Sequence, residues 1–448
     1  MSIIQNIFFF ILALSILVAV HEWGHYYVAK LCKVKIIRYS IGFGKPLYKR
    51  ITSSGMEFVI AAIPLGGYVR MLDGRVDELE EQDKAVAFNF KPVWQRFAIV
   101  AAGPIVNFIF AIFAAMVIGL IGYQAQKPVV AEVAQGSYFY NAGVQPLDEI
   151  VQIGDTQTQT WRSVSMQMVT FSGEDVMPIK VKDDNGVERD LTVAINGWKI
   201  DPDGQNIFDA FGITAYRPQT STTLYQVQEN SPAGVAGLKA GDKIIAIDGT
   251  SLENWSQIVG LIEPRLNQNG VIQVERDNRT LEFDIKFAEH PDFPGRGYLG
   301  VIPYSEPWPE KYVHTVEYGF WGAFKYGVEE TGRLVSVTFT MLGKLFTGDL
   351  SVKSLSGPIS IAEGAGTSAS YGLTEFLTFL ALISVNLGII NLLPLPVLDG
   401  GHLMYFIVEW ITGKPVSEAV QELGFRIGSV VLFAVMATAI FNDILRYI

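Results

Sequence analysis

An apolar segment near the N-terminus leads without a break into two histidines. The segment extends from Ile3 to Val20, and the motif His21-Glu22-Trp23-Gly24-His25 follows it directly. Residues four apart share one face of an α-helix, so His21 and His25 can offer ring nitrogens to one metal ion, with Glu22 beside them. A bound Zn²⁺ lowers the pKa of a water molecule to ~7, and a neighbouring carboxylate can accept its proton. The motif therefore predicts a hydrolase with Zn²⁺ as cofactor, His21 and His25 as ligands and Glu22 as general base.

Three further apolar stretches approach the ~20 residues that a helix needs to cross a bilayer. They cover residues 97–121, 376–393 and 427–440, in a chain of 448 residues of which 49% are hydrophobic. Together with the first segment they predict four transmembrane helices. The first segment lacks the basic residues and the cleavage site of a signal peptide, so we expect it to be retained. Ionisable side chains at the end of such a helix are costly without partners, which favours a functional metal site over two incidental histidines.

The distribution of charge predicts the orientation in the membrane. Residues 30–50 contain seven basic and no acidic residues, so the positive-inside rule places this loop and the adjoining active site at the cytoplasmic side. Residues 122–314 contain 15 basic and 26 acidic residues and so carry a net charge of −11, equal to that of the whole chain. We expect this acidic segment to lie outside the cytoplasm, and its acidity argues against a nucleic-acid partner. The single cysteine, Cys32, excludes an intrachain disulfide.

The acidic segment contains an internal repeat with an offset of 94 residues. Residues 142–153 align without gaps on residues 236–247, and Trp161 matches Trp255 at the same offset. Short alternating apolar runs, glycine-rich turns and one helix after each tryptophan predict two β-rich modules.

The second copy resembles a PDZ domain of the bacterial protease type, on the residues Asn230-Ser231-Pro232-Ala233, 236–242 and Ile247-Asp248-Gly249. The first copy resembles a degenerate sibling, because Pro146-Leu147 replaces the glycine expected before Asp148. The resemblance implies that each module accepts a peptide or protein segment as an added edge strand. Two alternatives stay open: the pair obstructs bulky substrates, or the modules are inert spacers.

Two histidines do not complete a catalytic zinc site, so a third ligand is required. Glu57 and Glu78 lie downstream of the motif, where soluble zinc proteases often place that ligand. Asp399 and His402 are better candidates, because residues 391–402 contain two prolines that break an apolar helix at the predicted depth of the histidine pair. The spacing alone does not distinguish Asp399 from His402.

The segment from residue 36 to residue 69 alternates short β-prone runs with glycine turns. A helical substrate hides its amide carbonyls in internal hydrogen bonds, so it must unwind before cleavage. We expect this segment to form a hairpin whose edge pairs with the unwound strand, and we assign Gly42, Phe43 and Gly44 to substrate positioning. Farther along the chain, residues 316–350 mix apolar side chains with charges, which predicts an interfacial amphipathic helix. This helix would couple the PDZ-like pair to the opening of the catalytic core.

Three motifs together resemble the site-2 protease family of intramembrane zinc metalloproteases: the histidine motif, Gly103-Pro104-Ile105-Val106-Asn107, and residues 391–399. The paired PDZ-like insert, residues 64–69 and Ser356-Gly357-Pro358-Ile359 narrow the resemblance to the regulator of sigma-E protease type of Gram-negative bacteria. It covers essentially the whole chain. Trp23 is one departure, because Phe is commoner inside the motif, and we expect it to leave the ligands unaffected.

The resemblance implies that His21, His25 and Asp399 bind zinc, that Glu22 is the catalyst, and that Asn391 helps to place the substrate backbone. It therefore favours Asp399 over the other candidates for the third ligand. It also implies a membrane-reentrant β element at the hairpin. The implied substrate is a single-span anti-sigma factor already cut by a periplasmic protease, so that cleavage releases a sigma factor and starts an envelope stress response. Remnant signal peptides are a second implied class.

The sequence thus predicts an α-helical membrane core of four transmembrane helices, a cytoplasmic membrane-reentrant β element and two periplasmic PDZ-like α+β domains, in a bacterial inner membrane and in contact with its lipids. The expected regions are a first transmembrane helix with the zinc motif (1–30), the β region (31–96), a second helix (97–121), two PDZ-like domains (122–220 and 221–306), an amphipathic helix (307–350), a third transmembrane region (351–411) and a fourth helix (412–448).

Two other functions stay open. One is a catalytically silent scaffold whose PDZ-like pair does the binding. The other is a transporter with Asp399 in an ion site, although the halves of the chain show no hydropathy repeat.

Overall fold

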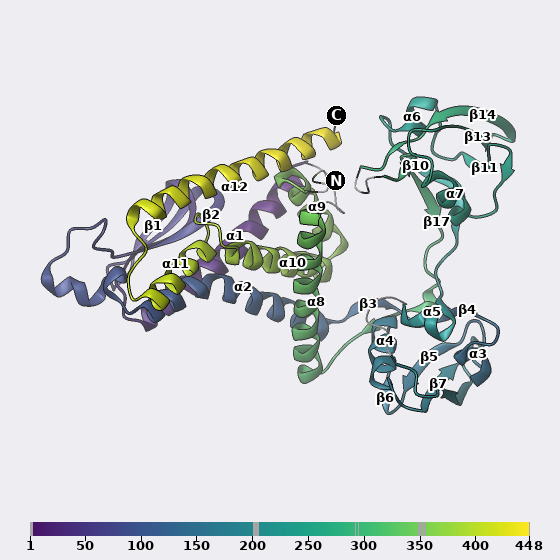
Figure 1. The fold of residues 1–448 in the computed structure, drawn as a ribbon, viewed down its shortest axis with the longest axis horizontal. Helices are drawn as coiled ribbons and strands as arrows, with labels where there is room; N and C mark the ends of the chain where they lie inside the picture. Colours follow the sequence, from purple (N-terminus) through teal and green to yellow (C-terminus); the bar gives the residue numbers. More distant parts are fainter. Residues whose placement is uncertain are drawn as a thin grey trace. The chain divides into compact units, whose positions relative to one another are not determined.

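The computed structural model describes residues 3–199, 206–291, 293, 295–347, 352 and 355–447. The end of the expected amphipathic helix at residue 350 and residues 200–205 of the first expected PDZ-like domain lie outside these ranges. The chain divides into two compact units (Figure 1). One contains residues 1–122 and 317–448, and the other contains residues 123–316.

Among the described residues, four helices are long and apolar enough to span a membrane, as predicted. They are α1 (Ile3–Leu31), α2 (Val93–Ile121), α10 (Leu373–Leu392) and α12 (Glu418–Tyr447). α1 continues past the apolar segment through the histidine motif without interruption. α12 begins before its apolar core, since its first turns are polar but helical. An ion pair between Glu422 and Arg426, one turn apart, supports these turns.

Three further helices complete the helical unit: α8 (Phe320–Thr347), α9 (Pro358–Tyr371) and α11 (Asp399–Thr412). α2 packs against α8 and α10, and Figure 1 shows α2 and α10 side by side. Ala111 and Ala114 of α2 bury Leu334 of α8 in a shared apolar cluster, so α8 is attached to the helical core. At the far end of α12, Asp443 accepts hydrogen bonds from the first backbone N–H groups of α9 and fixes the two helices together.

The predicted hairpin is present as β1 (Ile36–Ile51) and β2 (Glu57–Met71). Both strands bend, so that they form four paired segments. Residues 36–41 pair with residues 67–71 on one side, residues 38–41 pair with residues 57–60 on the other, and residues 46–51 pair with residues 57–61. The segment 67–71 is therefore a free edge of this sheet. Two short 3₁₀ helices, η1 (Glu81–Val86) and η2 (Phe88–Phe90), follow before α2.

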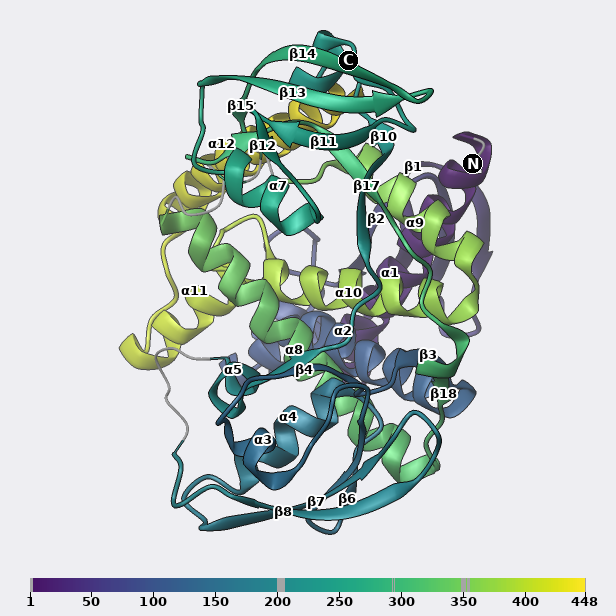
Figure 2. The ribbon, with the colours of Figure 1, turned by 90° about the vertical axis from the view of Figure 1, so that its right-hand side faces the viewer.

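The second unit contains the two predicted β-rich modules. The first module consists of β4 (Val130–Val133), α3 (Tyr138–Ala142), β5 (Glu149–Ile153), β6 (Thr156–Gln157), α4 (Trp161–Thr170), β7 (Val176–Lys182), β8 (Glu188–Ala194), α5 (Ile207–Phe211) and β9 (Ile213–Ala215). The second module consists of β10 (Thr220–Val227), α6 (Pro232–Ala236), β11 (Lys243–Ile247), β12 (Thr250–Ser251), α7 (Trp255–Ile262), β13 (Asn269–Arg276), β14 (Arg279–Lys286), β15 (Ala288–Glu289), β16 (Gly297–Tyr298) and β17 (Val301–Ser305). In the sheet of the second module, β14, β13, β11 and β10 are neighbours in this order (Figure 2).

The two modules share details that the alignment predicts. A helix begins at each aligned tryptophan. Leu147 has a left-handed backbone with φ of 71°, and Gly241, which aligns with it, has φ of 90°. Leu147 in the first module therefore adopts the same turn as Gly241 in the second. The left-handed conformation costs ~1–2 kcal/mol for a residue with a Cβ atom.

A pair of strands joins the two ends of the insert. β3 (Tyr123–Gln126) follows α2 and pairs antiparallel with β18 (Val313–Val316), which precedes α8 and follows the 3₁₀ helix η3 (Glu310–Tyr312). The two chain segments that leave the helical unit are therefore held together.

Candidate metal centre

Three side-chain donor atoms converge between α1 and the start of α11. Nε2 of His21 lies 3.2 Å from Nε2 of His25, and Oδ2 of Asp399 lies 3.3 Å and 3.4 Å from these two nitrogens. Among the described residues, these three side chains are the group of His, Cys, Asp and Glu whose donor atoms are close enough to share an ion. Residues that are 378 positions apart in the chain thus meet at one point.

The donor set fits Zn²⁺. Ligand bonds of ~2.0–2.1 Å at tetrahedral angles place ligand atoms roughly 3.3 Å apart, which is the spacing found here. Oδ2 of Asp399 is also buried and has no hydrogen-bond partner. An unpartnered buried carboxylate oxygen costs free energy, and a cation at this point removes that cost.

The ring of His25 is oriented by the backbone of α2. Its Nδ1 atom lies 2.9 Å from the carbonyl oxygen of Ile99, which can accept only if Nδ1 carries the proton. Nε2 then keeps its lone pair for a metal. The sequence does not predict this contact of His25 with the Ile99 carbonyl, because a backbone carbonyl is common to every residue type.

Asn107 and Gly103 of α2 also line the centre. Nδ2 of Asn107 lies 3.1 Å from Nδ1 of His21, and the Asn107 side chain is fully buried. Its backbone carbonyl accepts a 2.8 Å hydrogen bond from the hydroxyl of Ser384 on α10, so two helices fix its position. A Cβ atom at Gly103 would lie 2.3 Å from Nε2 of His25, so the close approach of α2 to the histidines requires a glycine here. Both residues stand in the motif of the family resemblance, but their roles are not predicted from the sequence.

Glu22 lies between the histidines and the free edge of the hairpin. It is 8% exposed, and its carboxylate accepts a hydrogen bond from the backbone N–H of Val69. A Cβ atom at Gly67 would lie 3.0 Å from Cγ of Glu22. The free edge segment therefore passes directly beside the carboxylate.

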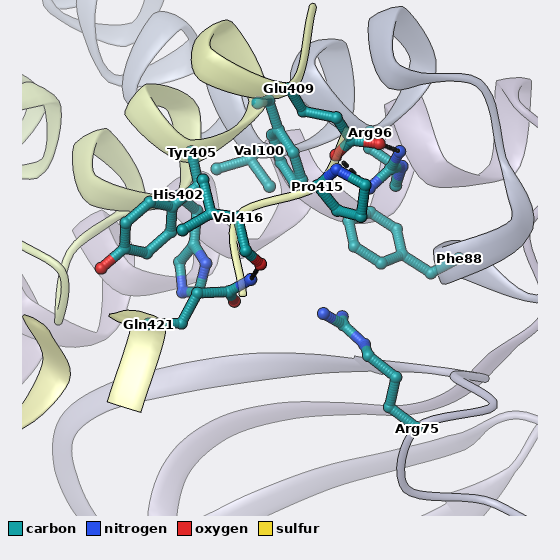
Figure 3. Close-up of a pocket in the computed structure, with 11 residues that line it drawn as sticks. Arg75, Phe88, Arg96, Val100, His402, Tyr405, Glu409, Pro415, Val416 and Gln421 are labelled. Atoms are coloured by element: carbon teal, nitrogen blue, oxygen red, sulfur yellow. Dashed lines mark hydrogen bonds and ion pairs between the residues drawn. The ribbon is translucent and has the colours of Figure 1, made fainter. Parts of the chain in front are cut away.

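The other candidates for a third ligand lie elsewhere. Glu57 forms ion pairs with Lys49 at 2.7 Å and with Arg38 at 2.6 Å. Their hydrogen bonds lower the pKa of Glu57, first that of Lys49 and then that of Arg38. Glu78 is exposed on the loop after β2. His402 lines a separate cavity one helical turn beyond Asp399 (Figure 3).

The expected substrate-positioning residues lie in two elements, β1 and α10. Gly42 and Gly44 adopt positive φ at the bend of β1, and Phe43 between them stacks on Tyr68 with ring centroids 6.2 Å apart. The Phe43 ring also covers Gly66, so this turn supports the start of the free edge. Asn391 lies in the last turn of α10, which ends at Leu392 before the predicted proline turn.

The chain is similar to known proteins over nearly its whole length. The model of peptidase family M50 matches residues 9–435. A Vibrio cholerae protein described as a zinc metalloprotease is 44% identical over 449 residues, which cover 99% of each chain. The regulator of sigma-E protease of Escherichia coli is 42% identical over 448 residues, which cover 100% of each chain. A solved PDZ domain of an SdrC-like protein from Listeria innocua is 25% identical, with a TM-score of 0.18, and covers 19% of this chain and 97% of that domain.

Proposed function

Because this chain belongs to peptidase family M50 and is a zinc metalloprotease, we propose that it cleaves single-span membrane proteins within or beside their membrane segment. The observation that carries this proposal is the convergence of three donor atoms at the end of a membrane-type helix. Membership in a peptidase family argues against the transporter and the silent scaffold.

We assign His21, His25 and Asp399 to the metal and Glu22 to proton transfer. Held by these three ligands, Zn²⁺ would supply Lewis-acid chemistry and a bound water of lowered pKa. Glu22, which follows His21 directly in α1, would accept a proton from that water and pass it to the leaving amide nitrogen. The hydrogen bond from Val69 holds the carboxylate at the hairpin edge.

The hairpin offers the unwound substrate a place to bind. Residues 67–71 pass Glu22 and pair with no strand other than residues 36–41, so an extended substrate strand can add to this edge. Phe43, between Gly42 and Gly44, packs its ring against Gly66 and so supports the start of the edge. We assign Asn391, at the end of α10, to contact with the substrate backbone.

The biological role is proposed by analogy with the similar proteins. We propose that the chain lies in the bacterial inner membrane, with the metal centre near the cytoplasm and the two modules in the periplasm. The substrate would be an anti-sigma factor first cut in the periplasm, with remnant signal peptides as a second class. The modules would accept extended segments, or they would exclude substrates that still carry a large periplasmic domain.

Reconstitution of the purified protein with a single-span substrate tests the proposal. We expect Glu22→Gln to keep zinc and to lower cleavage by about 10² or more, because a positioned base contributes this much. Asp399→Ala should lose both cleavage and zinc. His402→Ala is the matched control and should keep one zinc per chain. Full cleavage by Glu22→Gln, or full zinc content in Asp399→Ala, would contradict these assignments.

A further inference from the structure

A cavity of about 190 Å³ lies within the helical unit (Figure 3). Its apolar wall consists of Phe88, Val100, Phe406, Pro415 and Val416. Polar groups of the lining are Arg75, Arg96, His402, Tyr405, Glu409 and Gln421. None of these residues has a role in the proposed chemistry.

The cavity lies about one helical turn from the metal centre along two helices. On α2, Val100 lies one turn before Gly103, the residue in contact with His25. On α11, His402 lies one turn after Asp399. On each helix, a residue at the proposed metal centre and a residue of the cavity wall therefore lie on the same face.

The far end of the cavity is closed by a neutral ion pair. The Arg96 guanidinium binds the Glu409 carboxylate in two places, at 2.7 Å and 3.1 Å, and both side chains are largely buried. The Arg96 guanidinium also lies 5.1 Å above the ring of Phe406. Because its charges are matched, this end does not select a charged occupant.

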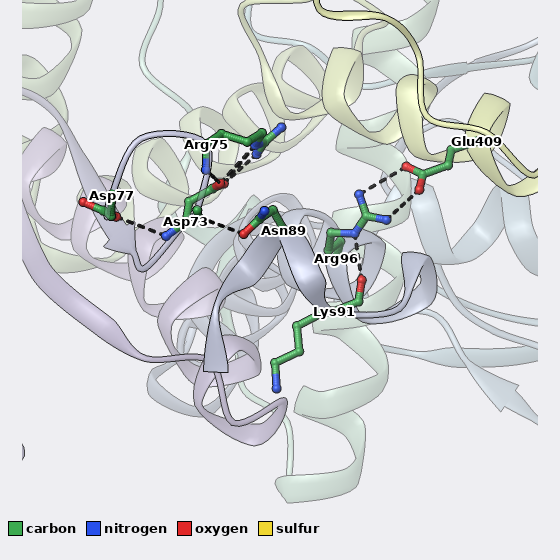
Figure 4. A network of polar contacts seen from close by, with 8 residues as sticks. Asp73, Arg75, Asp77, Asn89, Lys91, Arg96 and Glu409 are labelled. Atoms are coloured by element: carbon green, nitrogen blue, oxygen red, sulfur yellow. Dashed lines mark hydrogen bonds and ion pairs between the residues drawn. The ribbon is translucent and has the colours of Figure 1, made fainter. Parts of the chain in front are cut away.

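The third wall belongs to the loop that follows the free edge of the hairpin. Arg75 points toward the cavity from this loop, four residues after Met71, and Asp73 holds its guanidinium at 2.6 Å (Figures 3 and 4). Asp77 and Asn89 accept hydrogen bonds from the backbone of the same loop (Figure 4). A strand added to residues 67–71 would thus lead toward a cavity wall whose position is fixed.

We propose that this cavity is a substrate subsite that receives one large apolar side chain, such as Leu, Met or Phe, near the cleaved bond. An apolar cavity of about 150 Å³ holds a benzene molecule, so the volume here fits one such side chain. The inference rests on the proposed function, because it needs a substrate strand at the hairpin edge. It adds a selectivity that the metal centre alone does not supply.

The test fills the cavity. A substrate panel carries Ala, Leu or Phe at each position around the cleaved bond, and kcat/KM is measured for each. We expect the wild type to prefer Leu or Phe over Ala by about 10–200-fold at one position, the range expected for such contacts. In Val416→Trp this ratio should fall to about one. Val420→Trp is the matched control, because Val420 is 54% exposed near the start of α12 and outside the cavity lining, and it should keep the ratio.

A second measurement does not need cleavage. In a Glu22→Gln and Cys32→Ser background, Val416→Cys should form a disulfide with a cysteine at the preferred substrate position, whereas Val420→Cys should not. A preference that survives in Val416→Trp, a wild type without any preferred position, or no disulfide from Val416→Cys would each overturn the subsite. Absence of all cleavage by the zinc-loaded wild type would instead overturn the proposed function, while the disulfide still reports on the cavity.

Discussion

The side-chain amide of Asn107 meets Nδ1 of His21 at 3.1 Å, while Oδ1 of the same amide is buried without a partner. If Oδ1 instead faces His21, Nδ1 carries the proton, Nε2 is free for the metal, and the amide oxygen gains its partner. Asn107 would then orient His21 as the Ile99 carbonyl orients His25.

This relationship predicts opposite results for two substitutions of similar size. Asn107→Asp still accepts from Nδ1 and should keep zinc affinity near that of the wild type. Asn107→Leu cannot accept and should weaken zinc about 10–100-fold. Zinc affinity measured by chelator competition checks both, with helix content as the control for folding. Equal loss of zinc in both variants would contradict the acceptor role of Asn107.

Gly103 and Gly119 provide a matched pair on α2. Gly103→Ala places a Cβ atom 2.3 Å from Nε2 of His25, so we expect loss of zinc and of cleavage in a protein that still inserts into the membrane. Gly119→Ala meets Ala323 at 3.3 Å, which a small shift can relieve, and zinc should stay bound. Zinc content per purified chain measures the difference. A zinc-loaded Gly103→Ala protein would contradict the close packing of α2 on the histidines.

A buried ion pair within the second module, between Asp242 and Arg276, should contribute to its stability. Asp242 is fully buried, accepts two hydrogen bonds from Arg276 and accepts the Lys239 N–H at 2.8 Å. Asp242→Ala leaves these donors unpaired and should destabilise the second module by about 1–3 kcal/mol. Hydrogen exchange of β11 and β13 in the full-length protein measures this effect. Asp284→Ala, at an exposed position of β14, should change exchange little.

The pairing of β3 with β18 should weaken in acid. Burial holds the pKa of the His314 imidazole below its usual value, Lys127 lowers it further, and Glu149 acts in the opposite direction. The unfolded chain therefore binds a proton near the usual pKa of 6.5, and the folded chain only at lower pH. Stability from this group is complete above pH ~6.5 and is lost as the pH falls below that value.

Hydrogen exchange of the β3 and β18 amides between pH 7 and pH 5, corrected for intrinsic rates, measures this dependence. His314→Gln removes the titrating group and should flatten the profile. An identical pH profile for the variant and the wild type would rule out His314 as the cause.

Several features follow from local sequence alone. The i, i+4 spacing of His21 and His25 places both on one helical face, whatever the rest of the fold does. The apolar runs predict four membrane-type helices, because length and hydropathy are properties of contiguous residues. The offset of 94 residues predicts two like modules, and the aligned tryptophans mark the start of α4 and α7.

The long-range contacts depend on how the helices and strands pack. The sequence left Glu57, Glu78, Asp399 and His402 as candidates from their spacing. Helix packing decided which lies beside the histidines: it brings Asp399 within 3.4 Å of both rings.

The support around the centre was decided in the same way. The Ile99 carbonyl, the Asn107 amide and the glycine surface at Gly103 lie on α2, more than 70 residues from the histidines, so no local pattern connects them. The double pairing of residues 36–41 likewise sets which edge of the hairpin stays free beside Glu22. Donor atoms separated along the chain meet only when packed helices fix their distances, and that information is absent from any contiguous stretch of sequence.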